Sequence, residues 1–540
     1  MIIKEKSMKK VVSLRYPDLD KTSSYKLLKK LSRKPISLLN LLNKDRIEKY
    51  QTENAGLTYS YATSLVNDKV IDALQKLAGN AHVWERYEDI QSGKIMNPSE
   101  GRMVLHHKTR NPIDRGMYGE EQKKIAEFAN KIRSGEIRSA SGAPFTTIVQ
   151  IGIGGSFLGP QAVYSALERY ESNKETPNKP LKTHFISNVD PDDANHVLNQ
   201  IDIKKTLFVV VSKSGTTQET LTNMAFVKEK AKQLGLAEKD LSKHFVAVTG
   251  KGSPMDNPKQ FLSSFYIDDH IGGRYSVTSA VGGTVLSLAY GPEVFEKFLQ
   301  GAAQMDEAAK SKDIRKNMAI LDAGISVWER NFLGFPMKDI SPYSSALNSF
   351  ADHLQQLYCE SNGKSVNFYG NPIKYQTGTM IFGKPGTDSQ HSYFQKLHQG
   401  SDVIPMQLII GKNPQIKKDL STFGSSSQEK LIANMVAQMV ALGKGKTGKN
   451  AYEFFTGNRP TSMICYDQLT PKTLGALLAH YENKTMFESF LQNLNAFDQP
   501  GVELGKKLTT ELLSNKIPAD KKDASLLALM DVVKKAKPIV

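Results

Sequence analysis

Cysteine and long hydrophobic runs are both scarce in this chain of 540 residues. Cys359 and Cys465 are the two cysteines, which argues against a disulfide scaffold and favours a reducing compartment. No apolar run approaches the roughly 20 residues that span a bilayer, so no membrane partner is expected. The N-terminal Met-Ile-Ile-Lys-Glu-Lys lacks the apolar core of a secretory signal, and we therefore expect a cytoplasmic protein.

Acidic residues are in deficit: there are 55 Asp and Glu against 71 Lys and Arg, a net charge of +16. The basic residues are spread along the chain rather than clustered in a tail or an aromatic-rich patch, so nucleic acid is not the expected partner. Steering of anionic small molecules explains the excess as well. With 39% hydrophobic and 23% charged residues, the composition is that of a globular protein with roughly two to four domains.

Two common nucleotide-binding signatures are missing. The turn Gly152-Ile-Gly-Gly-Ser156 follows a predicted strand, but Phe157 stands where a dinucleotide fingerprint needs glycine. The nearest candidate for a ribose-binding acid, Asp190, is roughly 35 residues on rather than about 20. Gly445-Lys446-Thr447 lacks the upstream glycine of a P-loop, since Val440 stands there. The glycine-rich turn therefore fits a small phosphorylated ligand better than a nicotinamide cofactor.

The stretch Thr206–Thr220 is the most informative segment. Its apolar, β-branched beginning predicts a buried strand, which leads into Ser212-Lys-Ser-Gly-Thr-Thr217 and then into a helix from Glu219. The first N–H groups of a helix favour an anion, and the glycine, lysine and hydroxyl groups add close approach, charge and donors. The segment predicts a phosphate site. The alternative is an ordinary N-cap cluster, because Ser and Thr are common at helix starts.

Strands and helices alternate from about residue 117 onward, which predicts a parallel sheet covered on both faces. The expected strands of this first sheet are 147–151, 183–189, 206–211 and 244–249. Helical patterns fill 290–360, and a second α/β domain of similar plan is predicted from strands near 365–369, 402–410 and 462–466. The expected domains are a helical and loop-rich N-terminal segment 1–116, α/β domains 117–288 and 289–510, and a helical C-terminal arm 511–540.

Several polar side chains stand where loops or helix ends fix them. Gln356 and Glu360 are four residues apart on a predicted helix and so share a face. The other candidates are Arg274 after two glycines, His391 in a loop of turn-forming residues, and Lys506 about one turn into a helix that follows Gln499. Taken singly, a satisfied polar contact explains each of them as well as a functional role does. His106 and His107 are adjacent and point apart, so no metal site is expected there.

Together these segments resemble the glucose-6-phosphate isomerase (phosphoglucose isomerase) family from about Asn97 to Lys507. The matching motifs are Gly152-Ile-Gly-Gly-Ser156, Ser212-Lys-Ser-Gly-Thr-Thr217-Gln-Glu-Thr, Gly272-Gly-Arg274-Tyr-Ser-Val-Thr-Ser, Glu360-Ser-Asn-Gly-Lys, Gly386-Thr-Asp-Ser-Gln-His391, Gly457-Asn-Arg-Pro and Phe497-Asp-Gln-Pro-Gly-Val-Glu-Leu-Gly-Lys506. Four positions depart from the usual pattern: Pro500 and Phe382 each replace a common Trp, and Ser214-Gly215 replaces a commoner Thr-Phe pair. The reactive side chains are spared.

The resemblance implies two doubly wound parallel-sheet domains of the sugar-isomerase (SIS) type, a homodimer, and interconversion of glucose 6-phosphate and fructose 6-phosphate in glycolysis and gluconeogenesis, with no cofactor or metal. It implies that Glu360 moves the proton between C1 and C2, that Arg274 stabilises the enediolate, and that His391 and Lys506 open the sugar ring. His391 is expected to come from the partner subunit. The substrate-binding residues implied are Gly155, Ser156, Ser212, Lys213, Ser214, Gly215, Thr216, Thr217, Gln356 and Gln499.

The implied chemistry agrees with physical expectation. A proton next to a carbonyl is weakly acidic, so its removal needs a base within reach and positive charge at the oxygen that becomes anionic. A remote phosphate supplies binding energy that fixes the geometry. Two other hypotheses keep the phosphate loops: a phosphosugar-binding sensor without chemistry, and an isomerase or aminosugar enzyme for another sugar phosphate. The sensor does not require Glu360, His391, Arg274 and Lys506 together, and no DNA-binding helix-turn-helix is evident.

Overall fold

The computed structural model describes residues 15–34, 36–111, 113–172, 180–416, 418–514, 517–518 and 522–538. The N-terminal residues used to judge a secretory signal lie outside these ranges. The chain divides into two compact units, Met1–Ala496 and Phe497–Val540. The predicted domain boundaries after residues 116, 288 and 510 stay predictions. Within the described part of the chain, every helix is too short or too polar to cross a membrane.

The first sheet has five strands, all parallel, in the order β6-β5-β7-β8-β9. The strands are β5 Thr147–Ile151, β6 Lys182–Ile186, β7 Thr206–Ser212, β8 Phe245–Thr249 and β9 Ser263–Tyr266. Four of them confirm the predicted strands to within a few residues. The fifth, β9, was not predicted. The chain order reverses between β5 and β7, the place where open parallel sheets usually bind ligands.

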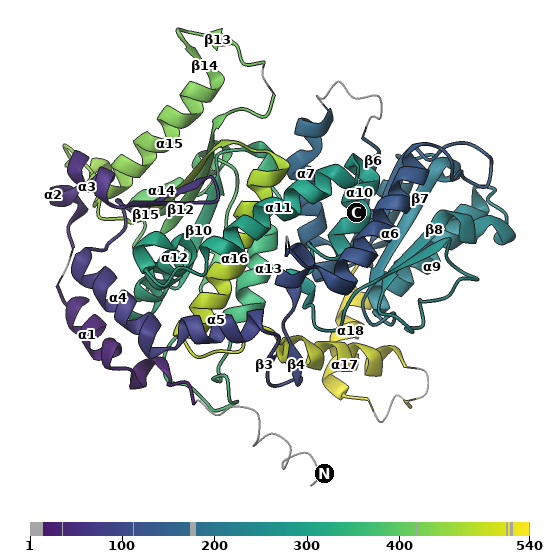
Figure 1. The fold of residues 1–540 in the computed structure, drawn as a ribbon, viewed down its shortest axis with the longest axis horizontal. Coiled ribbons are helices and arrows are strands. Elements are labelled where there is room, and N and C mark those ends of the chain that lie inside the picture. Colours follow the sequence, from purple (N-terminus) through teal and green to yellow (C-terminus); the bar gives the residue numbers. More distant parts are fainter. Residues whose placement is uncertain are drawn as a thin grey trace. The chain divides into compact units, whose positions relative to one another are not determined.

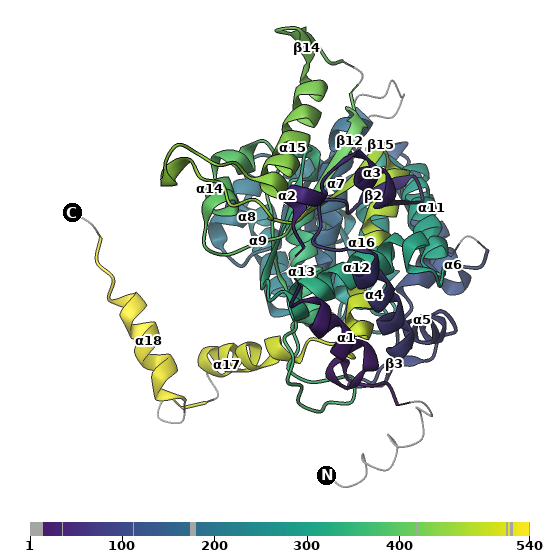
Figure 2. The ribbon, with the colours of Figure 1, turned by 90° about the vertical axis from the view of Figure 1, so that its left-hand side faces the viewer.

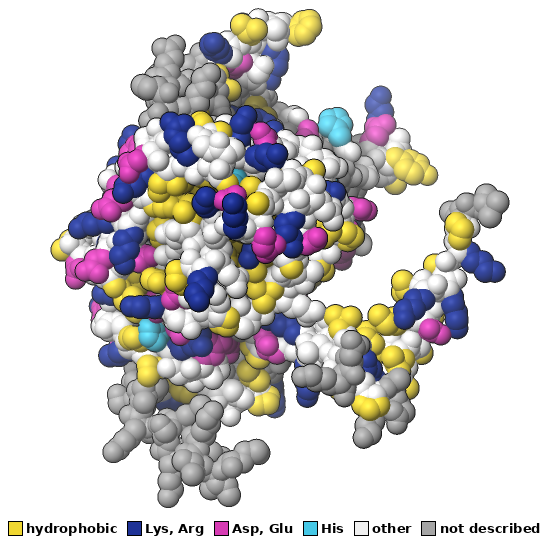
Figure 3. Space-filling view, turned by 90° about the vertical axis from the view of Figure 1, so that its right-hand side faces the viewer, with side chains coloured by type: hydrophobic (Ala, Val, Ile, Leu, Met, Phe, Trp, Pro, Cys, Tyr) yellow, Lys and Arg dark blue, Asp and Glu magenta, His cyan; other side chains and the backbone are white. Residues whose placement is uncertain are grey.

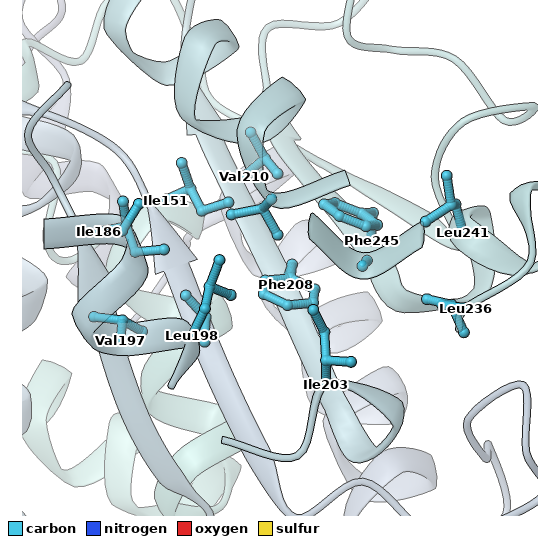
Figure 4. Close-up of a cluster of buried hydrophobic side chains, with 14 of the residues drawn as sticks. Ile151, Ile186, Val197, Leu198, Ile203, Phe208, Val210, Leu236, Leu241 and Phe245 are labelled. Atoms are coloured by element: carbon cyan, nitrogen blue, oxygen red, sulfur yellow. The ribbon is translucent and has the colours of Figure 1, made fainter. Parts of the chain in front are cut away.

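Helices cover both faces of this sheet. Phe208 and Val210 of β7 point into one apolar cluster together with residues of α8 Pro191–Leu198 and α9 Gln218–Gln233 (Figure 4). The opposite face is covered by α10 Ala280–Tyr290, which contacts four of the strands. Helices α6 Gly116–Arg133 and α7 Leu158–Ser172 pack against α10. The alternation of side chains along β7 thus buries both faces of the sheet.

The second sheet has six strands in the order β1-β2-β15-β12-β10-β11. The strands are β1 Gln51–Asn54, β2 Leu57–Ser60, β10 Met337–Pro342, β11 Met380–Phe382, β12 Met406–Asn413 and β15 Thr461–Gln468. The last four are parallel to one another, whereas β2 runs antiparallel to β15 and to β1. Neighbouring strands β2, β15 and β12 are labelled next to one another in Figure 2. Both sheets together confirm the predicted α/β class, with the N-terminal hairpin as an antiparallel addition to the second.

Two predictions about this second sheet were wrong. Residues 365–369 form no strand, and a single bridge joins Val366 to Pro372 there. Residues 290–360 are not helical throughout, because β10 lies among them; its Lys338, Asp339 and Ser341 are buried polar residues, so no apolar run marked it as a strand. The N-terminal segment is helical and loop-rich, as predicted, and it also contributes the strands β1 and β2 to this sheet.

Helices also cover both faces of the second sheet. Met406, Leu408 and Ile410 of β12 face α14 Phe394–Gln399 and α15 Ser427–Lys444. On the other face Gln407 accepts a hydrogen bond of 2.6 Å from Tyr481 Oη of α16 Pro471–Leu491. Helices α11 Pro292–Ala308, α13 Phe350–Asn362 and α16 lie between the two sheets (Figure 1). The remaining α-helices in the described part of this unit are α1 Ser23–Leu31, α2 Leu38–Leu41, α3 Lys44–Lys49, α4 Asp68–Asn80, α5 Val83–Gln91 and α12 Met318–Val327.

Two further two-stranded ribbons and the second unit complete the described structure. The ribbons are β3 Ile95–Asn97 with β4 Arg102–Met103, and β13 Ser421–Thr422 with β14 Ser425–Ser426. The second unit contains α17 Glu503–Leu513 and α18 Ala524–Lys534, which agrees with the helical arm predicted at the C-terminus.

A buried ion cluster joins three elements of the larger unit. Arg110 ends a 3-10 turn, and its Nε and Nη2 donate to the two carboxylate oxygens of Asp306 of α11 at 2.7 and 2.9 Å. Its Nη1 donates to Glu482 of α16. The side chains of Arg110 and Glu482 are fully buried. Because both carboxylates are desolvated, the guanidinium compensates charges that water cannot reach.

Replacing Arg110 with Met should therefore lower the free energy of unfolding by about 3–5 kcal/mol, since two buried carboxylates lose their cation. The matched control is Arg315→Met, which removes an exposed ion pair with Asp72 at 2.9 Å and should cost less than about 1 kcal/mol. Denaturant midpoints of the two variants measure the difference. Equal midpoints would show that the buried cluster contributes no more than a surface pair.

Candidate active site

The glycine-rich turn after β5 lies directly against the turn that carries Arg274. Residues Gly154–Ser156 form a 3-10 turn ahead of α7. A Cβ atom on Gly155 would lie 2.1 Å from the carbonyl carbon of Gly273, so no side chain fits between the two backbones. Gly154 has φ +59°, and a Cβ there would lie 3.2 Å from Nε2 of Gln356. Glycine at these positions brings the turn next to both Arg274 and α13.

The loop after β7 gathers hydroxyl groups at the start of a helix. Ser212 is the buried last residue of β7, and Thr217 precedes the first turn of α9. Their hydroxyl oxygens are 2.8 Å apart, and Thr216 donates from N and Oγ1 to Ser214 Oγ at 3.2 and 2.9 Å. The Thr217 side chain does not cap α9. The positive end of α9 is thus bordered by hydroxyl groups, as an anion site requires.

The Lys213 side chain binds backbone oxygens outside this loop, unlike the hydroxyl groups of Ser212, Ser214, Thr216 and Thr217, which contact one another. Its Nζ donates to the backbone oxygens of Asp269 and Ile271, at 3.2 Å in each case. Burial lowers the pKa of the Lys213 ammonium, with Arg102 acting in the same direction. The ammonium thereby ties the loop after β7 to the segment that leads into Arg274.

The Arg274 side chain is buried, with 1% of its surface exposed to solvent. Its Nε donates to Ser361 Oγ at 2.7 Å, and its Nη2 donates to the backbone oxygen of Ala496 at 2.5 Å. Its Nη1 lies 3.2 Å from Oε2 of Glu360. A guanidinium presents its donors in one rigid plane, so these contacts fix its orientation as well as its position.

Glu360 lies near the end of α13, with 30% of its side chain exposed. Gln356, one turn earlier, donates from Nε2 to Oε1 of Glu360 at 3.2 Å. The predicted shared helix face of these two residues is therefore confirmed. One carboxylate oxygen faces an amide and the other faces Arg274, while the group as a whole keeps access to solvent. A carboxylate in such surroundings can accept a proton from a bound ligand.

His391 ends a 3-10 turn between β11 and α14, and its side chain is exposed. The turn is held by Gln390, which donates to Tyr343 Oη at 2.9 Å, and by Tyr393, which donates to Asp339 Oδ1 at 2.8 Å. Burial raises the pKa of Asp339 to about 7. Across the described residues, no hydrogen bond or ion pair joins His391 to Arg274 or Glu360, so the structure brings those two together without the histidine.

Gln499 and Lys506 belong to the second unit. Gln499 precedes a 3-10 turn, and Lys506 lies one turn into α17, as predicted. The Lys506 ammonium pairs with Glu503 Oε1 at 2.9 Å, and both side chains are exposed.

Two residues beside the site were not singled out from the sequence. Ser361 accepts the hydrogen bond from Arg274 Nε, and Lys364 donates from Nζ to the backbone oxygens of Ser361 and Asn495 at 3.1 and 2.9 Å. Both belong to the Glu-Ser-Asn-Gly-Lys motif, and membership of this motif was the one feature of the sequence that pointed to them. Within the described ranges, no three His, Cys, Asp or Glu side chains form a group that could hold a metal ion.

Comparison with known proteins gives one consistent family. The family model described as phosphoglucose isomerase matches residues 60–529. The glucose-6-phosphate isomerase of Treponema denticola is 48% identical over 523 residues, covering 94% of this chain and 98% of that protein. The glucose-6-phosphate isomerase of Chlamydia pneumoniae is 43% identical over 540 residues, which covers 96% of this chain and 99% of that protein. The crystal structure of a glucose-6-phosphate isomerase from Chlamydia trachomatis has a TM-score of 0.89 at 41% identity, covering 96% of this chain and all of that one.

Gly155→Ala should disturb the site through the backbone contact with Gly273. The added methyl group has to displace one of two turns, which should lower the free energy of unfolding by about 1–3 kcal/mol and reduce activity by moving Arg274. Gly79→Ala is the control, because a Cβ there meets nothing within 4 Å and alanine favours a helix by about 0.5–1 kcal/mol. Thermal unfolding and activity assays compare the pair. A Gly155→Ala protein as stable and active as the Gly79→Ala protein contradicts the contact.

Proposed function

This chain belongs to the phosphoglucose isomerase family, and we propose that it interconverts glucose 6-phosphate and fructose 6-phosphate with Glu360 as the base that carries the proton between C1 and C2. The contact that carries the proposal is the 3.2 Å approach of Arg274 Nη1 to the Glu360 carboxylate. A base and a fixed positive charge at one place are what an enediolate intermediate needs. The reaction belongs to glycolysis and gluconeogenesis, which supports a cytoplasmic location.

Arg274 stabilises the negative charge that develops on the substrate oxygens. The side chain is buried, and in such a place a positive charge acts more strongly than it does in water. Gln356 holds the other carboxylate oxygen of Glu360 and lines the site.

The phosphate group binds where the turn after β5 and the loop after β7 carry their small polar residues. The side chains of Ser156, Ser212, Ser214 and Thr217 hold it, with help from the backbone at Gly155, Lys213, Gly215 and Thr216. The positive end of α9 and the hydroxyl contacts in the loop support this assignment. Because the phosphate is remote from C1 and C2, it orients the sugar rather than reacting.

Ring opening is the work of His391 and Lys506, and Gln499 contributes to sugar binding. An imidazole ring has one nitrogen that can donate a proton and one that can accept a proton, so a histidine can exchange a proton with the ring oxygen or the C1 hydroxyl. The substrate is then an open-chain sugar phosphate when Glu360 acts.

The functional form is a homodimer in which His391 enters the partner's site. Two observations support it: the His391 side chain is exposed, and it makes no hydrogen bond to Glu360 or Arg274 within the described ranges. The second unit also carries exposed hydrophobic side chains suited to a protein interface (Figure 3). These are Val502, Leu504, Leu513, Leu529, Val532 and Val533.

Glu360→Gln tests the base directly. The amide keeps the shape of the side chain but cannot take a proton, so turnover should fall by roughly 10²–10⁴-fold while substrate binding changes little. Exchange of solvent tritium into C2 of glucose 6-phosphate should fall equally, since exchange needs the base but not complete isomerisation. Glu296→Gln is the matched control: Glu296 also pairs with an arginine, Arg115, at 2.6 Å, but outside the site. Wild-type exchange in a folded Glu360→Gln protein would falsify the assignment.

A second experiment tests the sharing of His391. His391→Ala and Glu360→Gln proteins are each expected to be inactive, but refolding them together forms mixed dimers with one intact site. Random pairing makes half of the dimers mixed, so the mixture should recover roughly a quarter of wild-type activity. Each variant refolded alone, and the wild-type protein refolded alongside, serve as controls. If the mixture has only the summed activity of the two single variants, the histidine acts within its own subunit.

A further inference from the structure

Ser361 is the residue through which α13 holds the guanidinium of Arg274. Its hydroxyl is fully buried, accepts from Arg274 Nε at 2.7 Å and lies 3.0 Å from Tyr275 Oη. The Tyr275 ring in turn stacks on His106, with ring centroids 4.8 Å apart. The position of the hydroxyl is therefore fixed from its own helix and from the neighbouring turn.

Ser361 also follows Glu360 directly on α13, so one helical turn carries both the carboxylate and an anchor of the guanidinium. The second anchor, the backbone oxygen of Ala496, is tied to the same helix end. Lys364 makes this tie by binding the backbone oxygens of Ser361 and Asn495. With Nε and Nη2 both anchored, the plane of the guanidinium is set, and Nη1 remains directed at Glu360.

We propose that Ser361 is a positioning residue for the isomerisation: it sets the plane of the Arg274 guanidinium relative to the Glu360 carboxylate, and hence to the reacting oxygens. The proposal rests on the functions proposed above for Arg274 and Glu360. Ser361 does not touch the substrate. It acts by keeping the donor edge of Arg274 aligned with charge that exists only in the transition state.

Removing the Ser361 hydroxyl tests the orientation of the Arg274 guanidinium without changing its charge. A Ser361→Ala protein keeps Arg274 and its positive charge, so substrate binding should hold and KM should change by less than about twofold. The guanidinium loses one of its anchors, and misplacement of a catalytic group by about 1 Å costs up to roughly 10²-fold. The turnover number should therefore fall about 10- to 100-fold.

Two inhibitors distinguish the alignment from general damage to the site. A five-carbon sugar acid phosphate places a carboxylate where the enediolate oxygens develop, whereas a six-carbon sugar alcohol phosphate carries no charge there. Ser361→Ala should weaken binding of the acid by a factor close to its loss in turnover number. Binding of the alcohol should be unchanged. Ser361→Thr, which keeps a hydroxyl, should recover most of the turnover number and the affinity for the acid.

Ser489→Ala is the matched control for losing one buried serine hydroxyl. Ser489 of α16 is also fully buried, and its Oγ donates to the backbone oxygen of Met486 at 2.7 Å, away from the site. It should match Ser361→Ala in thermal stability to within a few degrees but keep the wild-type turnover number. If Ser361→Ala does not fold, Ser361→Cys, which has nearly the volume of serine but a weak acceptor, takes its place with the same expected pattern.

The results distinguish a failure of the positioning role of Ser361 from a failure of the proposed function. A wild-type turnover number in Ser361→Ala, or in Ser361→Cys in its place, overturns the proposal. So does an equal loss of affinity for both inhibitors, or an equal loss of turnover in Ser489→Ala. Activity remaining in Arg274→Met and Glu360→Gln would instead overturn the proposed function. Inactive Arg274→Met and Glu360→Gln proteins beside a fully active Ser361→Ala protein would reject only the positioning role.

Discussion

A positive charge removed from water has to be surrounded by partners, and around Arg274 this requirement brings distant parts of the chain together. The guanidinium binds Glu360 and Ser361 of α13 and the backbone oxygen of Ala496. The turn that carries it presses against Gly155. Loss of hydration makes each of these contacts costly to break, so the carboxylate, the cation and the glycine-rich turn keep fixed distances from one another. The arrangement of the site follows from this one buried cation.

A second buried charge organises the other side of the molecule. Asp322 of α12 accepts hydrogen bonds from Tyr59 Oη of β2 at 3.1 Å and from Gln407 Nε2 of β12 at 2.8 Å, and it forms an ion pair with Lys484 of α16 at 2.9 Å. Burial acts to raise the pKa of Asp322, but Lys484 and His480 hold it below its ordinary value. The carboxylate therefore stays charged, and it joins a hairpin strand, a parallel strand and two helices at one point.

The sequence predicted strands and helices whose apolar residues recur with a clear period. It missed a strand whose buried residues are largely polar. The run of β-branched residues in β7 and the helix-start residues around Thr217 were sufficient to predict the strand, the loop and α9. The pairing of Gln356 with Glu360 followed from helical spacing alone. By contrast, β10 was missed because Lys338 and Asp339 give it a polar sequence. These two residues are buried in contact with partners that lie outside the strand, and no local pattern predicts such contacts. The apolar and aromatic residues at 365–369 predicted a strand that does not form.

The site shows the same division. The motifs identified the residue types, but the link between Arg274 and Ala496 joins residues that are far apart in the sequence. No spacing rule predicts such a contact. Ser361 lies within one of these motifs, but the motif assigns it no function, because its contact with the Arg274 guanidinium is visible only in the folded structure.

The pairing of β2 with β15 constrains how the chain can reach its final form. Ser60 of β2 pairs with Met463 of β15, so a strand that is synthesised early cannot pair until a strand near the end of the chain has left the ribosome. The first sheet, whose strands all lie between Thr147 and Tyr266, can assemble during synthesis from contacts of modest sequence separation. The second sheet cannot close until most of the chain is made, and until then β2 of the N-terminal hairpin has an unpaired edge. Shortening the chain from its N-terminus past β2 would leave the facing edge of β15 permanently open, and self-association of the product is the physical consequence.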